Sequence, residues 1–181
     1  DAKDVFRDTV VEYFLAGYAA GETPNPCLAC NRSIRWEFLL NHALALGADH
    51  MATGHYARLE HEGGRVRLLK AVDPSKDQSY VLHVLNQEKL KHAMFPIGDY
   101  PKTEIRKIAE SFGLPTASRK DSQDLCFLAG DDYRNFLQRN AAQLLTHGEI
   151  VNSAGDIIGH HDGLVNYTIG QRKGLGVSSP V

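Results

Sequence analysis

Three cysteines constrain the fold of this 181-residue chain more than any other feature. Cys27 and Cys30 lie three positions apart in a Pro-Cys-x-x-Cys-Asn frame, and Cys126 stands far away in the sequence. A small, odd number of cysteines is not typical of a secreted fold held by disulfides, so we expect a hydrophobic core and a reducing, cytoplasmic compartment. Because a thiolate is a strong nucleophile and a soft metal ligand, the cysteines are also candidates for chemistry.

The composition is that of an ordinary globular protein, with 43% hydrophobic and 23% charged residues. The net charge of −2 does not indicate a dedicated electrostatic binder of nucleic acid. No run approaches the roughly 18 apolar residues of a membrane span, so no membrane partner is predicted. The chain begins at Asp1 and stops just after a glycine-rich run, which suggests a piece of a longer protein.

Apolar residues at helical spacing predict helices over residues 5–15, 31–44 and 102–112. Gly47 is a natural end for the second of these helices, and Gly113 followed by Leu114 and Pro115 ends the third. Thr103 is the predicted cap of the third helix. Pro24 and Pro26 predict an extended segment before the second helix, which places Cys30 at that helix's N-terminus, where backbone N–H groups favour a thiolate.

The strands are predicted from short apolar runs and turn residues. Residues 49–53 are predicted to form a short buried strand that ends at Gly54, and open α/β sheets present sites at such strand ends. A hairpin is predicted around Gly63-Gly64, and short helices over residues 78–85 and 87–92.

The character of the sequence changes after Cys126. Residues 133–145 are predicted to be helical, and a second hairpin is predicted around residues 153–155. We therefore place a domain boundary near Gly130, with a small β-rich module after it.

Two kinds of chemistry are open to the cysteines. If Cys30 and Cys126 meet, one thiol can carry a transferable sulfur as a persulfide and the other can release it by forming a disulfide. The three thiolates would instead suit an iron–sulfur cluster whose open iron holds an extra sulfide, whereas a structural zinc site wants four ligands. For Cys126, which lies between Leu125 and Phe127, a buried inert thiol is the competing interpretation.

Two polar segments are ambiguous from sequence alone. Lys76-Asp77-Gln78 follows a turn-forming Asp-Pro-Ser run and is either a binding loop or a solvated helix cap. His55, after Gly54, is either a site residue or a hydrogen-bonded core histidine. The glycine-rich basic loop of residues 169–176 lacks the Lys-Ser/Thr ending of a P-loop, so it does not support phosphate binding.

Several short segments are weak motifs when each is taken alone, but their order and spacing along the chain are specific. They are residues 21–26, 30–31, 46–49, 52–58, 73–80, 95–98, 120–122, 126–127, 161–163 and 167–176. In this order and spacing they resemble the tRNA-specific 2-thiouridylases (the MnmA/TrmU family), and the resemblance covers almost the whole chain.

The resemblance implies an α/β fold. Residues 1–130 would be the later part of a PP-loop catalytic domain, which is Rossmann-type and adenine nucleotide alpha hydrolase-like. Residues 131–181 would begin a small β-rich central domain that recognises tRNA. The family's ATP-binding Ser-Gly-Gly-x-Asp-Ser loop and its C-terminal barrel are not in the chain, so we expect that this fragment alone cannot adenylate a substrate.

The resemblance also implies a reaction, the 2-thiolation of tRNA. Mg-bound ATP would adenylate the C2 oxygen of the wobble uridine, with Gly54 lining the ATP site. Cys126 would carry a persulfide received from a relay protein or a cysteine desulfurase. Cys30 would be the nucleophile that completes transfer, leaving a Cys30–Cys126 disulfide. The residues implied in tRNA contact are Asn25, Pro26, Cys27, Lys76, Asp77 and Gln78.

Cys27 departs from the family pattern, which usually has an aspartate at this position. A third cysteine supports the alternative of a [4Fe–4S] cluster held by Cys27, Cys30 and Cys126. Two other functions stay open: an amide-forming PP-loop ligase, which would not need the cysteines, and a metal-stabilised RNA-binding module, which would unfold on chelation.

Overall fold

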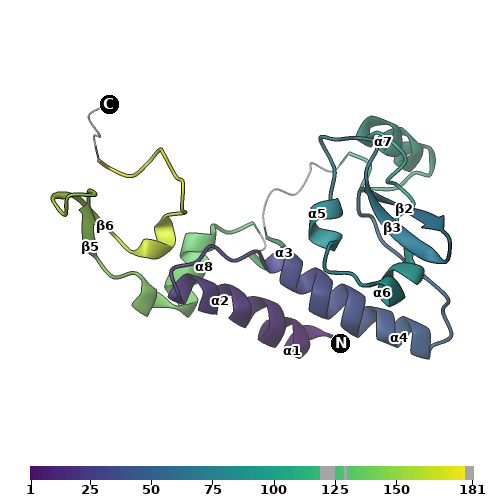
Figure 1. The fold of residues 1–181 in the computed structure, drawn as a ribbon, viewed down its shortest axis with the longest axis horizontal. Helices are drawn as coiled ribbons and strands as arrows, with labels where there is room; N and C mark the ends of the chain where they lie inside the picture. The colour runs from purple at the N-terminus through teal and green to yellow at the C-terminus, as the bar shows by residue number, and fades with distance from the viewer. Residues whose placement is uncertain (119–124, 129, 178–181) are drawn as a thin grey trace. The chain divides into compact units, whose positions relative to one another are not determined.

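The structure, a computed structural model, describes residues 1–118, 125–128 and 130–177. The family segment at residues 120–122 lies outside the described residues. The chain divides into two compact units. Unit 1 contains residues 1–9 and 27–123, and unit 2 contains residues 10–26 and 124–181. Figure 1 gives the order of the elements along the chain.

The chain begins with one helical run, made of α1 (Lys3–Phe6), the π-helical η1 (Arg7–Val11) and α2 (Glu12–Ala19). The helix predicted for residues 5–15 is confirmed and is longer at both ends. Gly21 ends the run with a φ of 74°, and the Glu22 N–H donates to the Gly17 carbonyl at 2.9 Å. These are features of a glycine C-cap, in which a left-handed residue satisfies the last carbonyls.

A second helical run comprises α3 (Pro26–Ala29), the π-helical η2 (Cys30–Leu39) and α4 (Leu40–Ala45). Gly47 has a φ of 87°, and the Ala48 N–H donates to the Ala43 carbonyl at 3.0 Å, so the predicted end of this helix is confirmed. Its predicted start is wrong. The helix begins at Pro26 rather than Asn31, because proline lacks an N–H and suits the first helical position.

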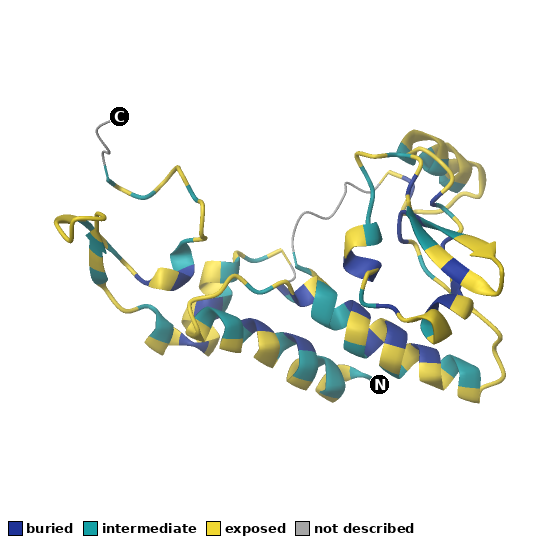
Figure 2. Cartoon of the chain, in the orientation of Figure 1, coloured by how far each residue is buried: buried dark blue, intermediate teal, exposed yellow. Residues whose placement is uncertain are grey.

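Trp36, on the second helical run, lies at the centre of the unit 1 core. Its side chain is 0% exposed and packs edge-on against Phe95, with the ring centroids 5.8 Å apart. Figure 2 shows buried positions recurring along this run and around the hairpin of the same unit. One cluster of buried residues in unit 1 comprises Trp36, Leu40, Ala57, Val66, Val81, Leu82, Leu85, Leu90, Ala93 and Phe95.

A short parallel pair is formed by β1 (Met51–Ala52) and β4 (Ala93–Met94), with Met51 opposite Ala93. The predicted strand at residues 49–53 exists, but it is shorter than predicted and is not buried, since Met51 is half-buried and Ala52 is exposed. In the described part of the chain β1 pairs only with β4, so it belongs to a two-stranded sheet rather than to a larger buried one.

The predicted hairpin is confirmed. β2 (Ala57–Glu62) and β3 (Arg65–Lys70) pair antiparallel, from Ala57 opposite Lys70 to Glu62 opposite Arg65. The two turn glycines, Gly63 and Gly64, have φ values of 56° and 76°. Positive φ at both central residues is what a type I′ turn requires, and glycine adopts it without steric cost.

The described part of unit 1 also contains α5 (Ser79–Leu82), α6 (Gln87–Lys91) and α7 (Lys102–Ser111). The side chain of Asn86 caps α6 by accepting from the Lys89 N–H at 3.0 Å. The predicted cap of α7 is wrong, because Thr103 lies inside the helix and makes no cap bond. Asp73 serves instead, its Oδ2 accepting from the Lys102 N–H at 3.2 Å.

Unit 2 has a smaller core built around Phe14 of α2. Phe14 makes edge-on ring contacts with Tyr18, Phe127 and Phe136. Burial of the Tyr18 hydroxyl raises its pKa, and the neighbouring Tyr133 adds to this effect while Arg134 opposes it. The elements of unit 2 that follow α2 are η3 (Cys126–Leu128), α8 (Tyr133–Asn140), η4 (Ala142–Leu144), β5 (Gly148–Val151), β6 (Ile157–His161) and η5 (Leu164–Asn166).

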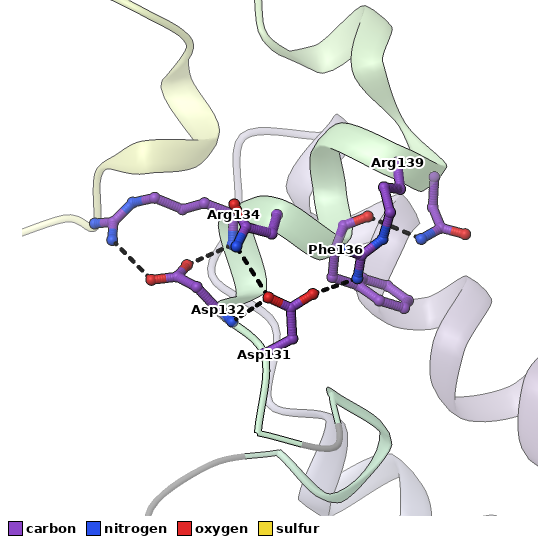
Figure 3. A network of polar contacts seen from close by, with 7 residues as sticks. Asp131, Asp132, Arg134, Phe136 and Arg139 are labelled. Atoms are coloured by element: carbon purple, nitrogen blue, oxygen red, sulfur yellow. Dashed lines mark hydrogen bonds and ion pairs between the residues drawn. The ribbon is translucent and has the colours of Figure 1, made fainter.

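The start of α8 is fixed by two aspartates (Figure 3). Asp132 caps the helix, its Oδ1 accepting from the Arg134 N–H at 2.7 Å. Asp131 accepts from the side chain of Asn135 at 2.9 Å and pairs with Arg139, and these bonds hold its pKa below the usual range. The helix predicted for residues 133–145 is confirmed up to Asn140. Ala141, with a φ of −153°, interrupts it before the short turn η4.

The second predicted hairpin is also confirmed, by the antiparallel pair of β5 and β6. Among the described residues, no helix is both long enough and apolar enough to cross a membrane.

Gly98 should be irreplaceable, because the chain passes too close to it for any side chain. A Cβ at this position would lie 1.7 Å from the carbonyl oxygen of Ala57 at the start of β2. We expect Gly98→Ala to lower the free energy of unfolding in urea by about 3 kcal/mol. Gly54→Ala is the matched control, since a Cβ there meets nothing within 4 Å. Equal stability of the two variants would contradict the packing described for Gly98.

Candidate functional site

Cys27 and Cys30 both lie inside the helix rather than before it. Pro26 is the first residue of α3, which puts Cys27 in the first turn and Cys30 one turn further along. Cys27 is exposed and Cys30 is half-buried, and both carry thiols. The prediction that Cys30 occupies the helix N-terminus is thus wrong by one turn, and Cys27 is the residue nearest the first N–H groups.

Asn31 holds the turn that carries these thiols. Its side chain is 4% exposed, and its Nδ2 donates to the carbonyl of Cys27 at 3.0 Å. Its Oδ1 is buried with no hydrogen-bond partner among the described residues. A buried unsatisfied amide oxygen is costly, so its presence beside both cysteines marks this turn as a functional candidate. Sequence reasoning did not assign Asn31 a role, and its position directly after Cys30 was the available signal.

Cys126 is exposed to solvent, although its neighbours in the sequence are apolar and pack into the core. It starts η3, where the Leu128 N–H donates to the Leu125 carbonyl at 3.0 Å. Leu125 and Phe127 pack against the unit 2 core and Leu128 is buried, while Cys126 is exposed. The interpretation of Cys126 as a buried inert thiol is therefore wrong. An exposed thiol on an anchored turn is accessible to a sulfur donor or to another thiol.

The cysteines are divided between the units, with Cys27 and Cys30 in unit 1 and Cys126 in unit 2. Over residues 1–118, 125–128 and 130–177, no three His, Cys, Asp or Glu side chains gather to hold a metal ion. A [4Fe–4S] cluster on all three cysteines would need ligands from both units, so it stays a prediction.

The loop of residues 73–78 is shaped by its own acidic and amide side chains. Asp77 accepts from the Ala71 N–H at 2.8 Å and from the Ser79 hydroxyl at 2.7 Å. Gln78 exchanges bonds with Tyr56, its Oε1 accepting from the Tyr56 N–H at 3.0 Å and its own N–H donating to the Tyr56 carbonyl at 2.8 Å. Asp77 and Gln78 therefore hold the loop in shape.

Asp73 links the same loop to α7. Besides capping that helix, it accepts from the N–H and the hydroxyl of Ser75 at 3.0 and 2.6 Å. The Ser75 side-chain bond and then the Lys102 backbone bond hold the pKa of Asp73 below its usual range. The Lys102 ammonium also lies 5.3 Å from the centre of the Tyr56 ring, a cation–π distance. Lys76 is thus carried on a loop that is bonded at both ends.

Gly54 and His55 follow β1. Gly54 is exposed, with open space where a side chain would stand. His55 is 6% exposed, its Nδ1 lies 2.8 Å from the hydroxyl of Thr53, and its ring meets Phe95 edge-on. Burial lowers the pKa of His55 from 6.5 to about 4, and the Arg35 charge adds to the shift. His55 is therefore a neutral, hydrogen-bonded core histidine at pH 7.

His55 makes stability depend on pH in a defined window. Between pH 6.5 and about 4, His55 binds a proton in the unfolded chain but not in the folded chain. The stability that the neutral His55 contributes is therefore complete above pH 6.5 and is lost as the pH falls toward 4. We expect the free energy of unfolding to drop by about 2 kcal/mol from this site across the window. The measurement is urea unfolding at several pH values for the natural protein and for His55→Asn, which keeps an amide for Thr53. Identical slopes for the two proteins would contradict the burial assigned to His55.

The sequence matches two neighbouring family models. They are the tRNA methyl transferase HUP domain, over residues 1–130, and the tRNA methyl transferase PRC-barrel domain, over residues 134–180. The predicted fold class, a Rossmann-type α/β domain followed by a small β-rich domain, is confirmed by these matches.

The most similar proteins include tRNA-specific 2-thiouridylases. The chain is 49% identical over 178 residues to tRNA-specific 2-thiouridylase MnmA 1 of Thermoanaerobacter sp. strain X514, which covers 97% of this chain and 49% of that protein. It is 53% identical over 172 residues to the MnmA of Polynucleobacter asymbioticus, covering 95% of this chain and 46% of that protein. The chain spans about half the length of the curated relatives it matches. It belongs to the tRNA methyl transferase HUP-domain family, and its predicted resemblance to the tRNA-specific 2-thiouridylases is confirmed.

Proposed function

We propose that this chain is part of an enzyme that transfers sulfur to a uridine of tRNA, a tRNA-uridine 2-sulfurtransferase. The observation that carries the proposal is the setting of the thiols. Cys30 lies on a helix whose first turn is braced by Asn31, and Cys126 is held exposed on an anchored turn. The names of the similar relatives support the same reaction and the same substrate class.

The sulfur chemistry balances with two thiols. Cys126 carries a terminal sulfur as a persulfide, and that sulfur attacks C2 of the uridine after the C2 oxygen has been activated. The activated oxygen leaves, and the sulfur now links C2 to Cys126. The Cys30 thiolate then attacks the Cys126 sulfur, which breaks the bond to the transferred sulfur and forms a Cys30–Cys126 disulfide. The tRNA departs with 2-thiouridine, and a reductant restores both thiols.

ATP supplies the activation in this scheme, by adenylating the C2 oxygen so that AMP becomes the leaving group. Gly54 is the residue of this chain proposed for the ATP site. It follows β1, and the space that a side chain would occupy at this position is open. A HUP domain is consistent with nucleotide use. The disulfide formed in every cycle must be reduced, so a reducing compartment such as the cytoplasm suits the reaction, with a cysteine desulfurase or relay protein as sulfur donor.

Contact with tRNA is proposed at two places. Asn25, Pro26 and Cys27, at the start of the helix, would lie against the target base, and Lys76 would reach a backbone phosphate from its braced loop. For Asp77 and Gln78 the proposal is narrower, because their bonds to Ala71, Ser79 and Tyr56 give them a positioning role. We also propose Gly130 as the boundary between the catalytic part and the small domain that follows.

Methyl transfer is the competing reaction, because the matching family models carry that description. A methyl group passed from a sulfonium donor needs no pair of thiols, so the two cysteine settings favour sulfur transfer. The mass of the modified nucleoside separates the two reactions, since one replaces oxygen by sulfur and the other adds a methyl group.

The proposed roles of the thiols predict the outcome of serine substitution. In the full-length protein, Cys30→Ser and Cys126→Ser should each reduce 2-thiouridine formation by about 1,000-fold or more, because serine cannot form or break a disulfide. Thiolated nucleoside is measured by mass spectrometry after digestion of the tRNA. Retention of thiolation by both variants would refute the mechanism, and a methylated product would select the competing reaction.

Lys76 and Asp77 should respond differently to substitution. Lys76→Ala should weaken tRNA binding and reduce the slope of log affinity against log salt by about 1. Asp77→Asn should lower the free energy of unfolding by about 1–2 kcal/mol. The two carboxylate oxygens accept from the Ala71 N–H and the Ser79 hydroxyl, and in the variant an amide nitrogen would face one of these donors. Asp77→Asn as stable as the natural protein, or Lys76→Ala with an unchanged salt slope, would contradict these assignments.

A further inference from the structure

Cys27 and Cys30 lie three positions apart, on successive turns of one helical run. α3 spans Pro26–Ala29, and Cys30 follows as the first residue of η2. Side chains three positions apart on a helix face the same side, with their Cβ atoms about 5–6 Å apart. Cys27 is exposed and Cys30 is half-buried, and both belong to unit 1. The local helix geometry therefore places the two thiols beside one another, independently of how unit 2 is placed.

The spacing suits a reversible disulfide. A disulfide requires Cβ atoms about 3.5–4.5 Å apart, so the helical separation must shrink by about 1–2 Å. The first turn can yield more easily than the middle of the helix, because it lies at the helix end and Pro26 supplies no N–H. Asn31 keeps the Cys27 carbonyl bonded through a side chain, which can follow a small backbone shift.

We propose that Cys27 is the resolving thiol of the sulfur-transfer cycle, an inference that rests on the proposed function. The Cys27 thiolate attacks the Cys30 sulfur of the Cys30–Cys126 disulfide. The Cys30–Cys126 bond breaks, a Cys27–Cys30 bond forms, and Cys126 leaves as a thiolate that takes a proton from water. One disulfide replaces another, so no oxidant is consumed.

The exchange separates reloading from reduction. Cys126 regains its thiol at once and can accept the next persulfide from the sulfur donor. The oxidising equivalents remain on the Cys27–Cys30 pair, where an external dithiol reduces the bond with two electrons and two protons. Since Cys27 is exposed, the pair is open to that reductant.

The first test does not depend on tRNA or ATP. Full-length Cys126→Ser protein is equilibrated in glutathione redox buffers, and its peptides are mapped by mass spectrometry without reduction. We expect reversible formation of a Cys27–Cys30 disulfide, and its absence from the Cys27→Ser/Cys126→Ser double variant. Formation of glutathione adducts alone, with no Cys27–Cys30 bond at any buffer ratio, would overturn the proposal.

The second test follows the cycle with tRNA, ATP and a persulfide donor, with thiols trapped by alkylation. The natural protein should accumulate the Cys27–Cys30 disulfide, and Cys27→Ser and Cys27→Ala should accumulate Cys30–Cys126 instead. When the reductant is scarce, later turnovers in these variants should slow relative to the first turnover. The ratio of the two rates should be about tenfold lower than in the natural protein. An unchanged ratio, with Cys30–Cys126 as the only disulfide of the natural protein, would overturn the resolving role while leaving the proposed function intact. Absence of 2-thiouridine from the natural protein would overturn both.

Discussion

Burial of Trp36 is the interaction on which the rest of unit 1 depends. Its fully buried ring packs against Phe95 and anchors the second helical run in the core. The same run begins at Pro26 and carries Cys27 and Cys30 in its first turns. A reactive group on a helix fixed by a core side chain is held more precisely than one on a loop. The hydrophobic core and the candidate chemistry are therefore parts of one element.

Local signals were sufficient to predict much of the fold. The periodicity of residues 5–15 and 102–112 gave two helices, and Gly47 and Gly113 ended helices because left-handed glycines satisfy the last carbonyls. The errors came from interactions that sequence proximity does not show. Asp73, rather than the nearby Thr103, caps α7 from 29 positions away. Pro26 has two possible meanings, an extended segment or a helix start, and nearby residues alone did not decide between them.

The sequence predicted which residues belong to the candidate site better than it predicted their burial and hydrogen bonding. The exposure of Cys126 could not be read from its apolar neighbours, because in a tight turn adjacent side chains point in different directions. Of the two interpretations of His55, the structure supports the core residue, because burial and the contact with Thr53 both favour the neutral ring. Asp77 and Gln78 resemble binding residues in sequence, yet their oxygens are used to shape the loop that carries Lys76.

The central claim is that sulfur passes through Cys126 to tRNA. The most direct measurement follows isotopically labelled sulfur in the full-length protein, from a persulfide donor to the protein and then to tRNA after ATP is added. The account predicts that the label appears first on the peptide containing Cys126, as a persulfide, and then in 2-thiouridine with matching loss from that peptide. Label that reaches the tRNA without ever residing on Cys126, in a protein that contains iron and acid-labile sulfide, would contradict it.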